Sequence, residues 1–191
     1  MSLKTLDSPV WFVLLVATVA AERVFELWLS RRNFVRVERR GGFVADSRSY
    51  WDMVVFQTAF LVACPLEVVA FDRPFVPALG LPALLLVGAA MLLRFVAVAA
   101  LGDRWSLRLV VVPGEPPVTT GPYRFIRHPN YLALALETVA LPLVHGAWVA
   151  ACTLVPVFVP LLVRRIRLEE AALSRHSDYE RAFAGRGRLF P

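Results

Sequence analysis

Residues 77–101 read PALGLPALLLVGAAMLLRFVAVAAL, an uninterrupted apolar segment in which Arg94 is the single charged side chain. About 20 apolar residues are enough for a helix to cross the hydrocarbon core of a bilayer. Four other segments have the same apolar character, and the last two are separated by a break near His145 and Gly146. The predicted membrane spans are residues 9–29, 50–71, 77–101, 130–144 and 147–163.

The composition indicates the same class of protein. Of the 191 residues, 58% are hydrophobic and 19% are charged, whereas a soluble domain has roughly 45–50% apolar and about 25% charged residues. These proportions exclude an ordinary soluble globule, a disordered chain and a small disulfide scaffold. We predict one all-α domain over residues 1–191, a polytopic membrane bundle of about five helices with a cytoplasmic, amphipathic C-terminal helix.

The two cysteines and the first apolar run also bear on disulfides, metal sites and a signal peptide. Cys64 and Cys152 lie in separate apolar runs and outside any CxxC or Cys/His pattern, so we expect neither a disulfide nor a metal site. The first run lacks a small-residue cleavage site, so we expect it to be a retained span and not a removed signal peptide.

Basic residues are distributed unevenly over the predicted loops. The net charge of +6 would suggest nucleic-acid binding in a soluble protein. However, 17 of the 21 Lys and Arg residues follow the first, third and fifth spans, against Lys4 and Arg73 on the other side. Because cytoplasmic loops are enriched in Lys and Arg, we predict an outside N-terminus, a cytoplasmic C-terminus, a plasma-membrane location and no nucleic-acid partner.

The segment GPYRFIRHPNY, residues 121–131, concentrates polar chemistry just before the fourth span. Its Gly-Pro pair is typical of a turn, and Pro129 suits the first position of a helix. Free backbone N–H groups at that helix start would favour an anion. An equally good interpretation is a basic loop with interfacial tyrosines at the membrane edge.

A second charged segment, RRIRLEE at residues 164–170, directly follows the fifth span. Its carboxylates can bind an ammonium group, and an arginine can hold a carboxylate or enolate in a planar fork. The alternative is a surface helix with the pairs Arg165–Glu169 and Arg167–Glu170, although arginine preceding glutamate is the weaker orientation. Because the last two spans form a hairpin, both charged segments are expected to be neighbours in space.

Charged side chains also occur inside the predicted spans. They are Glu22, Arg23, Glu26, Glu67, Arg94 and Glu137. Such residues usually face the bundle interior, where they are paired or functional. We expect structural ion pairs for Glu22, Arg23 and Arg94, while a structural and a functional role for Glu137 remain equally open. His145 and His176 are expected to be bystanders.

The two charged segments together resemble the isoprenylcysteine carboxyl methyltransferase family of membrane enzymes, with its G-x-Y-x-x-x-R-H-P-x-Y and R-x-x-x-E-E-x-x-L motifs. The matching residues are Gly121, Tyr123, Arg127, His128, Pro129 and Tyr131, then Arg165, Glu169, Glu170 and Leu173. The chain departs from the pattern at Ala133, where the family often has glycine. Its tail, Arg188 to Pro191, lacks the full R-V-P-R-x-x-P pattern.

The resemblance implies an O-methyltransferase that uses S-adenosyl-L-methionine, bound between the cytoplasmic loop and the C-terminal helices. The implied cofactor-binding residues are Tyr123, His128, Pro129, Tyr131, Glu169 and Glu170. Either glutamate would meet the ammonium group of the cofactor. The implied catalytic residues are Arg165, which would orient the acceptor, and Glu170, which would support the site.

The first half of the chain resembles a bacterial subgroup of this family associated with type III polyketide synthases. This resemblance rests on residues 30–33 (SRRN), on Arg40-Gly41-Gly42, and on Tyr50 and Glu67. It implies a phenolic lipid such as an alkylpyrone as acceptor and a type III polyketide synthase as pathway partner. The carboxyl group of a prenylcysteine-like lipid is the acceptor implied by the wider family.

Two other classes of function stay open. One is a membrane reductase of the sterol type that uses NADPH, and the other is a non-catalytic protein that binds a membrane lipid. The sequence has no Gly-rich nucleotide loop after a strand and no motif for a Ser-His-Asp triad. Binding of a sulfonium donor, of a dinucleotide, or of neither would separate the three classes.

Overall fold

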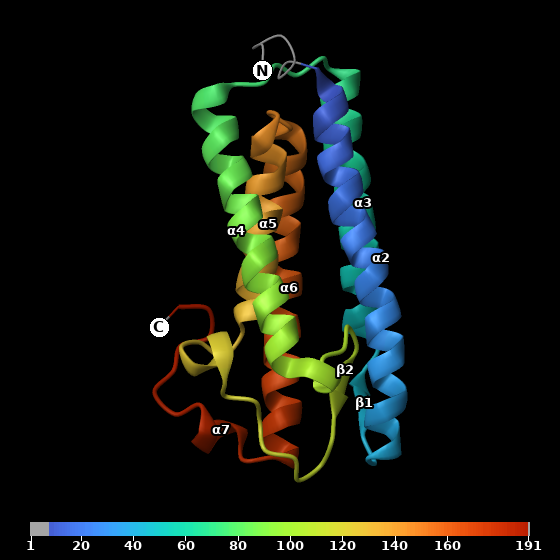
Figure 1. Ribbon diagram of the computed structural model, residues 1–191, viewed down its shortest axis with the longest axis vertical. Coiled ribbons are helices and arrows are strands. Elements are labelled where there is room, and N and C mark those ends of the chain that lie inside the picture. Colours follow the sequence, from blue (N-terminus) through green and yellow to red (C-terminus); the bar gives the residue numbers. More distant parts are fainter. Residues whose placement is uncertain (1–7, 191) are drawn as a thin grey trace.

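A computed structural model describes residues 8–190 and consists mainly of five long helices lying side by side (Figure 1). These helices are α2 (Pro9–Arg39), α3 (Arg48–Ala70), α4 (Pro77–Leu101), α5 (Pro129–Val144) and α6 (Trp148–His176). The predicted all-α bundle is confirmed. Lys4, which the charge argument placed on the outer side, lies outside the described residues.

The helix ends follow local sequence features. Prolines occupy the first turn of α2, α4 and α5, where a missing N–H group leaves no hydrogen bond unmade. The turn between α5 and α6 contains Gly146 at φ +70°, a conformation that favours glycine. Both α2 and α6 continue well past the predicted spans, so the amphipathic segment at the C-terminus is the second half of α6.

Three helices among the described residues are long and apolar enough to cross a membrane: α3, α4 with the turn after it, and α6. Helix α5 is apolar but has 16 residues, which span about 24 Å at 1.5 Å per residue, against a hydrocarbon core of about 30 Å. Helix α2 carries Glu22, Arg23 and Glu26 within its apolar part. That α2 and α5 also cross the membrane therefore stays a prediction.

Loops and short elements gather at one end of the bundle, where α2 and α6 extend furthest (Figure 1). The strands β1 (Phe43–Asp46) and β2 (Leu109–Val111) pair antiparallel there. Three short helices lie at the same end: η1 (Gly102–Arg104), η2 (Gly121–Arg124) and α7 (Tyr179–Ala182). The sequence analysis predicted no strand, because segments of three or four residues show no clear alternation.

The core lies between the helices, and apolar side chains also cover the outside. Phe12, Phe60 and Phe158 are almost completely buried, whereas Leu85 and Phe95 of α4 are 76% and 70% exposed. Helices α4 and α5 approach closely at Gly80, where an added Cβ would lie 2.6 Å from the carbonyl oxygen of Val144. An apolar exterior around a packed interior is the pattern of a membrane bundle.

Ion pairs are present inside the bundle, and Glu26 and Glu137 are the acidic partners of Arg23 and Arg94. Arg94 of α4 donates to Glu26 of α2 at 2.5 and 2.6 Å. Arg23 donates to Glu26 at 2.8 Å and to Glu137 of α5 at 2.5 Å. Glu22 lies 3.9 Å from Arg23 on its own helix and forms no ion pair with another helix among the described residues.

Glu67 of α3 stabilises the start of α6. Its carboxylate accepts hydrogen bonds from the backbone N–H groups of Val149 at 3.0 Å and Ala150 at 2.7 Å. It also pairs with Arg73 at 2.9 Å. An acidic group at a helix N-terminus satisfies free N–H groups and favours the helix dipole.

Candidate active site

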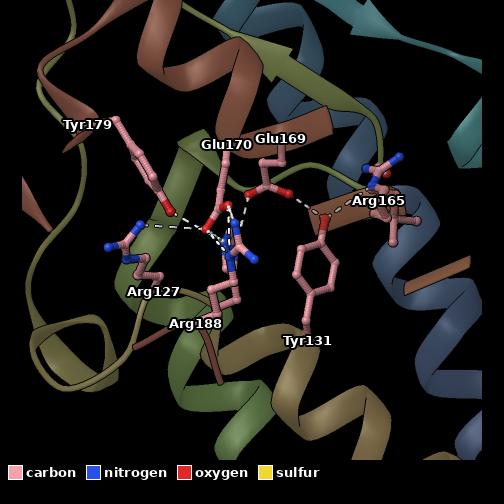
Figure 2. Close-up of polar contacts among 9 residues, drawn as sticks. Arg127, Tyr131, Arg165, Glu169, Glu170, Tyr179 and Arg188 are labelled. Atoms are coloured by element: carbon pink, nitrogen blue, oxygen red, sulfur yellow. Dashed lines mark hydrogen bonds and ion pairs between the residues drawn. The ribbon is translucent and has the colours of Figure 1, made fainter. Parts of the chain in front are cut away.

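The two charged segments meet at the loop end of the bundle, as the hairpin of α5 and α6 predicts. Tyr131, in the first turn of α5, donates its hydroxyl proton to Glu169 of α6 and accepts a hydrogen bond from Nε of Arg165 at 3.1 Å (Figure 2). Arg165 and Glu169 are one helical turn apart, so both can face the same phenol. The three side chains form one continuous polar chain.

Arg165 is a buried cation whose hydrogen-bond partners are uncharged. Its Nη1 donates to the hydroxyl of Ser49 at 2.8 Å, and its Nη2 donates to the carbonyl of Leu107 at 2.7 Å. Only 4% of the residue is exposed, yet no carboxylate among residues 8–190 forms an ion pair with it. A guanidinium has five N–H donors, so donors remain available. The surface-helix alternative, with an Arg165–Glu169 pair, is wrong.

Glu170 points away from this chain toward the C-terminal segment (Figure 2). Nε and Nη2 of Arg188 lie 2.9 and 2.7 Å from its Oε2. Nε2 of His128 lies 3.3 Å from Oε1, and Arg127 is 3.8 Å away. Burial would raise the pKa of the Glu170 carboxyl, but the hydrogen bonds from Arg188 and His128 hold it below its usual value.

The C-terminal segment fastens the loop before α5. Backbone N–H groups of Arg127 and His128 donate to the carbonyls of Gly187 at 3.0 Å and Arg188 at 2.9 Å. The guanidinium of Arg186 donates to the carbonyl of Tyr123 at 2.8 Å. Sequence reasoning missed these contacts because it treated the tail as a departure from the family pattern. The arginines of the tail were the feature that could have revealed them.

Glu169 is left with a free carboxylate oxygen. Its Oε2 accepts from Tyr131, whereas its Oε1 forms no hydrogen bond within the described part of the chain and lies 4.0 Å from Nδ1 of His128. The side chain is 30% exposed. Two adjacent glutamates therefore differ in what they can bind, because one is saturated by the tail and the other is accessible.

Two cavities lie on either side of Arg165. The loop cavity, of about 170 Å³, is lined by the segments 104–118 and 123–131 and by the end of α6 and α7. The helix cavity, of about 160 Å³, is lined mainly by α2, α3 and α5. Both are lined by Trp105, Ser106, Asn130, Tyr131 and Arg165. These five residues form a shared wall between the cavities.

The loop cavity collects most of the residues predicted to bind the cofactor. Tyr123, His128, Tyr131 and Glu169 line it, whereas Pro129 and Glu170 are not among its lining residues. Burial, and then the negative charge of Glu169, raise the pKa of the Tyr123 hydroxyl, which stays protonated at neutral pH. No group of three or more potential metal ligands occurs within residues 8–190.

Comparison with known proteins connects this arrangement to a family. The model of the isoprenylcysteine carboxyl methyltransferase family matches residues 83–175, which contain both motifs and the hairpin between them. The chain belongs to this family. The family assignment makes it a membrane methyltransferase. The family match ends before the C-terminal segment that binds Glu170.

Two bacterial relatives are similar along most of their length. Uncharacterized protein YpbQ of Bacillus subtilis (strain 168) is 31% identical over 167 residues, which are 87% of this chain and 98% of the relative. An uncharacterized protein of Haemophilus influenzae is 27% identical over 161 residues, which are 83% and 92% of the two chains. The similarity therefore extends beyond the matched family segment to the N-terminal helices.

Proposed function

We propose that this membrane methyltransferase transfers a methyl group from S-adenosyl-L-methionine to an oxygen of a lipophilic acceptor. The observation that carries the proposal is the position of Arg165, a buried cation without an ion-paired carboxylate among the described residues, in the wall shared by two cavities. Buried charges are normally paired. A buried guanidinium that has no direct ion pair and keeps unused N–H donors is suited to an anionic oxygen.

The loop cavity suits the donor. Its aromatic and apolar lining, which includes Tyr123, Trp105 and Phe183, would surround the adenosyl group. The free Oε1 of Glu169 would accept from the donor's ammonium group. When bound, S-adenosyl-L-methionine would supply a sulfonium methyl group for in-line displacement by an acceptor oxygen.

The helix cavity suits the acceptor. It lies among the apolar helices, and Arg165 closes the end that it shares with the loop cavity. The unused N–H donors of Arg165 would orient a carboxylate or the oxygen of an acidic phenol, both of which are already nucleophilic near neutral pH. Ser49, Leu107 and Tyr131 would hold the guanidinium in place. Catalysis would then depend on proximity and alignment, which are worth effective molarities of about 10⁵–10⁸ M.

The proposed orientation places the loop cavity in the cytoplasm, at the plasma membrane. It is supported by the arginines at the loop end of the bundle, which include Arg31, Arg36, Arg104, Arg124 and Arg175. A water-soluble donor would enter from the cytoplasm, and a lipid acceptor would enter through the bilayer. The resemblance to the subgroup associated with type III polyketide synthases extends the proposal to a phenolic lipid from such a pathway.

Equilibrium binding of labelled S-adenosyl-L-methionine to the detergent-purified protein tests the donor assignment. We expect saturable binding that Glu169→Gln weakens about tenfold or more, because the variant loses the charge that faces the ammonium group. Glu38→Gln, an exposed position at the end of α2, is the matched control and should bind as the wild type does. Binding of NADPH in place of the sulfonium would favour the reductase class, and binding of neither by folded protein would refute S-adenosyl-L-methionine as the donor.

A further inference from the structure

Several residues that line the helix cavity carry buried polar atoms without hydrogen-bond partners. Within residues 8–190, nine buried side-chain nitrogen and oxygen atoms have no hydrogen-bond partner, and five of them belong to residues lining this cavity. These five atoms are Nε of Arg23, Oε1 of Gln57, Nη1 of Arg94, Nε1 of Trp105 and Oδ1 of Asn130. They come from α2, α3, α4, α5 and the segment after η1.

A buried polar atom without a hydrogen-bond partner is costly in a membrane protein. An amide or hydroxyl without a hydrogen bond in an apolar environment costs roughly 2–7 kcal/mol, and the bilayer core supplies no water to replace the missing partner. The same cavity is otherwise apolar, with Leu27, Leu61 and Leu134 in its lining. Unpaired donors and acceptors gathered at one cavity indicate a ligand that pairs with them.

The charges around the cavity define the ligand further. Arg23 and Arg94 are already paired with Glu26 and Glu137, so these four side chains have no net charge. Arg165 is the remaining arginine of the lining and has no ion-paired carboxylate within the described residues. An anionic oxygen is therefore favoured at Arg165, and an uncharged oxygen is favoured beside Arg94 and Gln57.

We propose that Gln57, Arg94 and Asn130 form a polar anchor in the helix cavity for a second, uncharged oxygen group of the lipid acceptor, a hydroxyl or a carbonyl distinct from the oxygen that is methylated. This inference rests on the proposed function for the role of Arg165. The guanidinium Nη1 donates to that oxygen, and an amide side chain accepts from a hydroxyl or donates to a carbonyl. The anchor selects lipids with at least two oxygen groups in the head over lipids with one.

Binding of matched probes in the absence of S-adenosyl-L-methionine tests the anchor. The probes are two pairs with a common chain length: dodecanoic acid with 3-hydroxydodecanoic acid, and 3-dodecylphenol with 5-dodecylresorcinol. We expect the probe with two oxygen groups to bind about tenfold tighter in at least one pair, the change that a net hydrogen bond of about 1.4 kcal/mol gives. Equal affinity within both pairs would overturn the proposal.

The variant Gln57→Leu separates an anchor from a structural role. The substitution removes an unpaired oxygen at nearly constant side-chain volume, so the thermal midpoint of the variant should equal or exceed that of the wild type. Its preference for the probe with two oxygen groups over the probe with one should fall. Thr153→Val, whose hydroxyl donates to the carbonyl of Val149 at 2.7 Å on α6, is the control and should keep the preference. A lower midpoint with an unchanged preference would assign Gln57 to structure. Because the probes are measured without S-adenosyl-L-methionine, a protein that does not bind this donor would refute the proposed function and leave the probe result unchanged. The two proposals can therefore fail separately.

Discussion

The substitution Glu170→Gln should destabilise the protein, because this carboxylate holds the C-terminal segment against α5 and α6. The variant keeps one acceptor oxygen but presents an amide N–H group to the N–H donors of Arg188 or His128. The bond to His128 is buried, and a hydrogen bond to a charged group contributes about 1.5–3 kcal/mol. Arg188 has a side chain that is 56% exposed, so its ion pair adds only about 0.2–1 kcal/mol.

Together these contacts predict a loss of about 2–4 kcal/mol in the free energy of unfolding. A domain of this size shifts by roughly 2–4 °C for each kcal/mol, so the thermal midpoint should fall by about 4–16 °C. Intrinsic tryptophan fluorescence of the detergent-purified protein measures this midpoint. Glu169→Gln is the control at the neighbouring position, where the amide oxygen can still accept from Tyr131, and it should change the midpoint by less than about 2 °C.

The difference in thermal midpoint between wild type and Glu170→Gln should depend on pH, because the pKa of Glu170 is lowered in the folded protein. A group with a folded-state pKa below its unfolded value stabilises the fold fully above the unfolded pKa, here about 4.5, and loses that contribution as the pH falls through the folded value. The midpoint difference between wild type and Glu170→Gln should therefore be present at neutral pH and shrink below about pH 4.5. The contacts of Glu170 with Arg188 and His128 form a latch for the C-terminal segment. Equal midpoints of the two proteins at pH 7 would refute this role of Glu170.

Two further substitutions test other parts of the site. Arg165→Lys should lower the incorporation of labelled methyl groups into extractable membrane lipid by about 10²-fold or more, because about 3 kcal/mol of planar hydrogen bonding is lost. Donor affinity should change little. Equal losses in both measurements would place Arg165 in donor binding. Glu67→Ala should lower the thermal midpoint by about 1–8 °C, because loss of a helix cap costs about 0.5–2 kcal/mol, and donor affinity should stay unchanged. A midpoint like that of the wild type would mean that α6 needs no cap from α3.

The sequence was sufficient to predict the helices and the meeting of the two motifs. Each apolar run predicts one helix, and prolines mark the first turn of α4 and α5. A tight turn at Gly146 then makes α5 and α6 antiparallel neighbours, so residues near 128 and near 165–170 must lie close together. Local features and one short connection were all that this prediction required.

The roles of Glu169 and Glu170 could not be predicted in the same way. The two residues are adjacent and chemically identical, and their surroundings come from segments far away in the sequence. Arg188 saturates Glu170 from the C-terminal segment, while Ser49 and Leu107 fix Arg165 from α3 and from the segment before β2. Such long-range partners leave no periodic trace, so only the folded arrangement distinguishes the accessible carboxylate from the buried one.

Helical geometry explains how one turn of α6 can serve several purposes. Residues four apart lie on the same face of a helix, so Arg165 and Glu169 both reach Tyr131 and both line the loop cavity. Glu170 is about 100° further round, because a helix has 3.6 residues per turn, and it faces His128 and the tail. The order of Arg165, Glu169 and Glu170 thus gives α6 one face toward the cavities and another toward the latch. Inserting a single residue between Arg165 and Glu169 would rotate one motif residue away from Tyr131, which makes the spacing, more than the residue types alone, the requirement of this site.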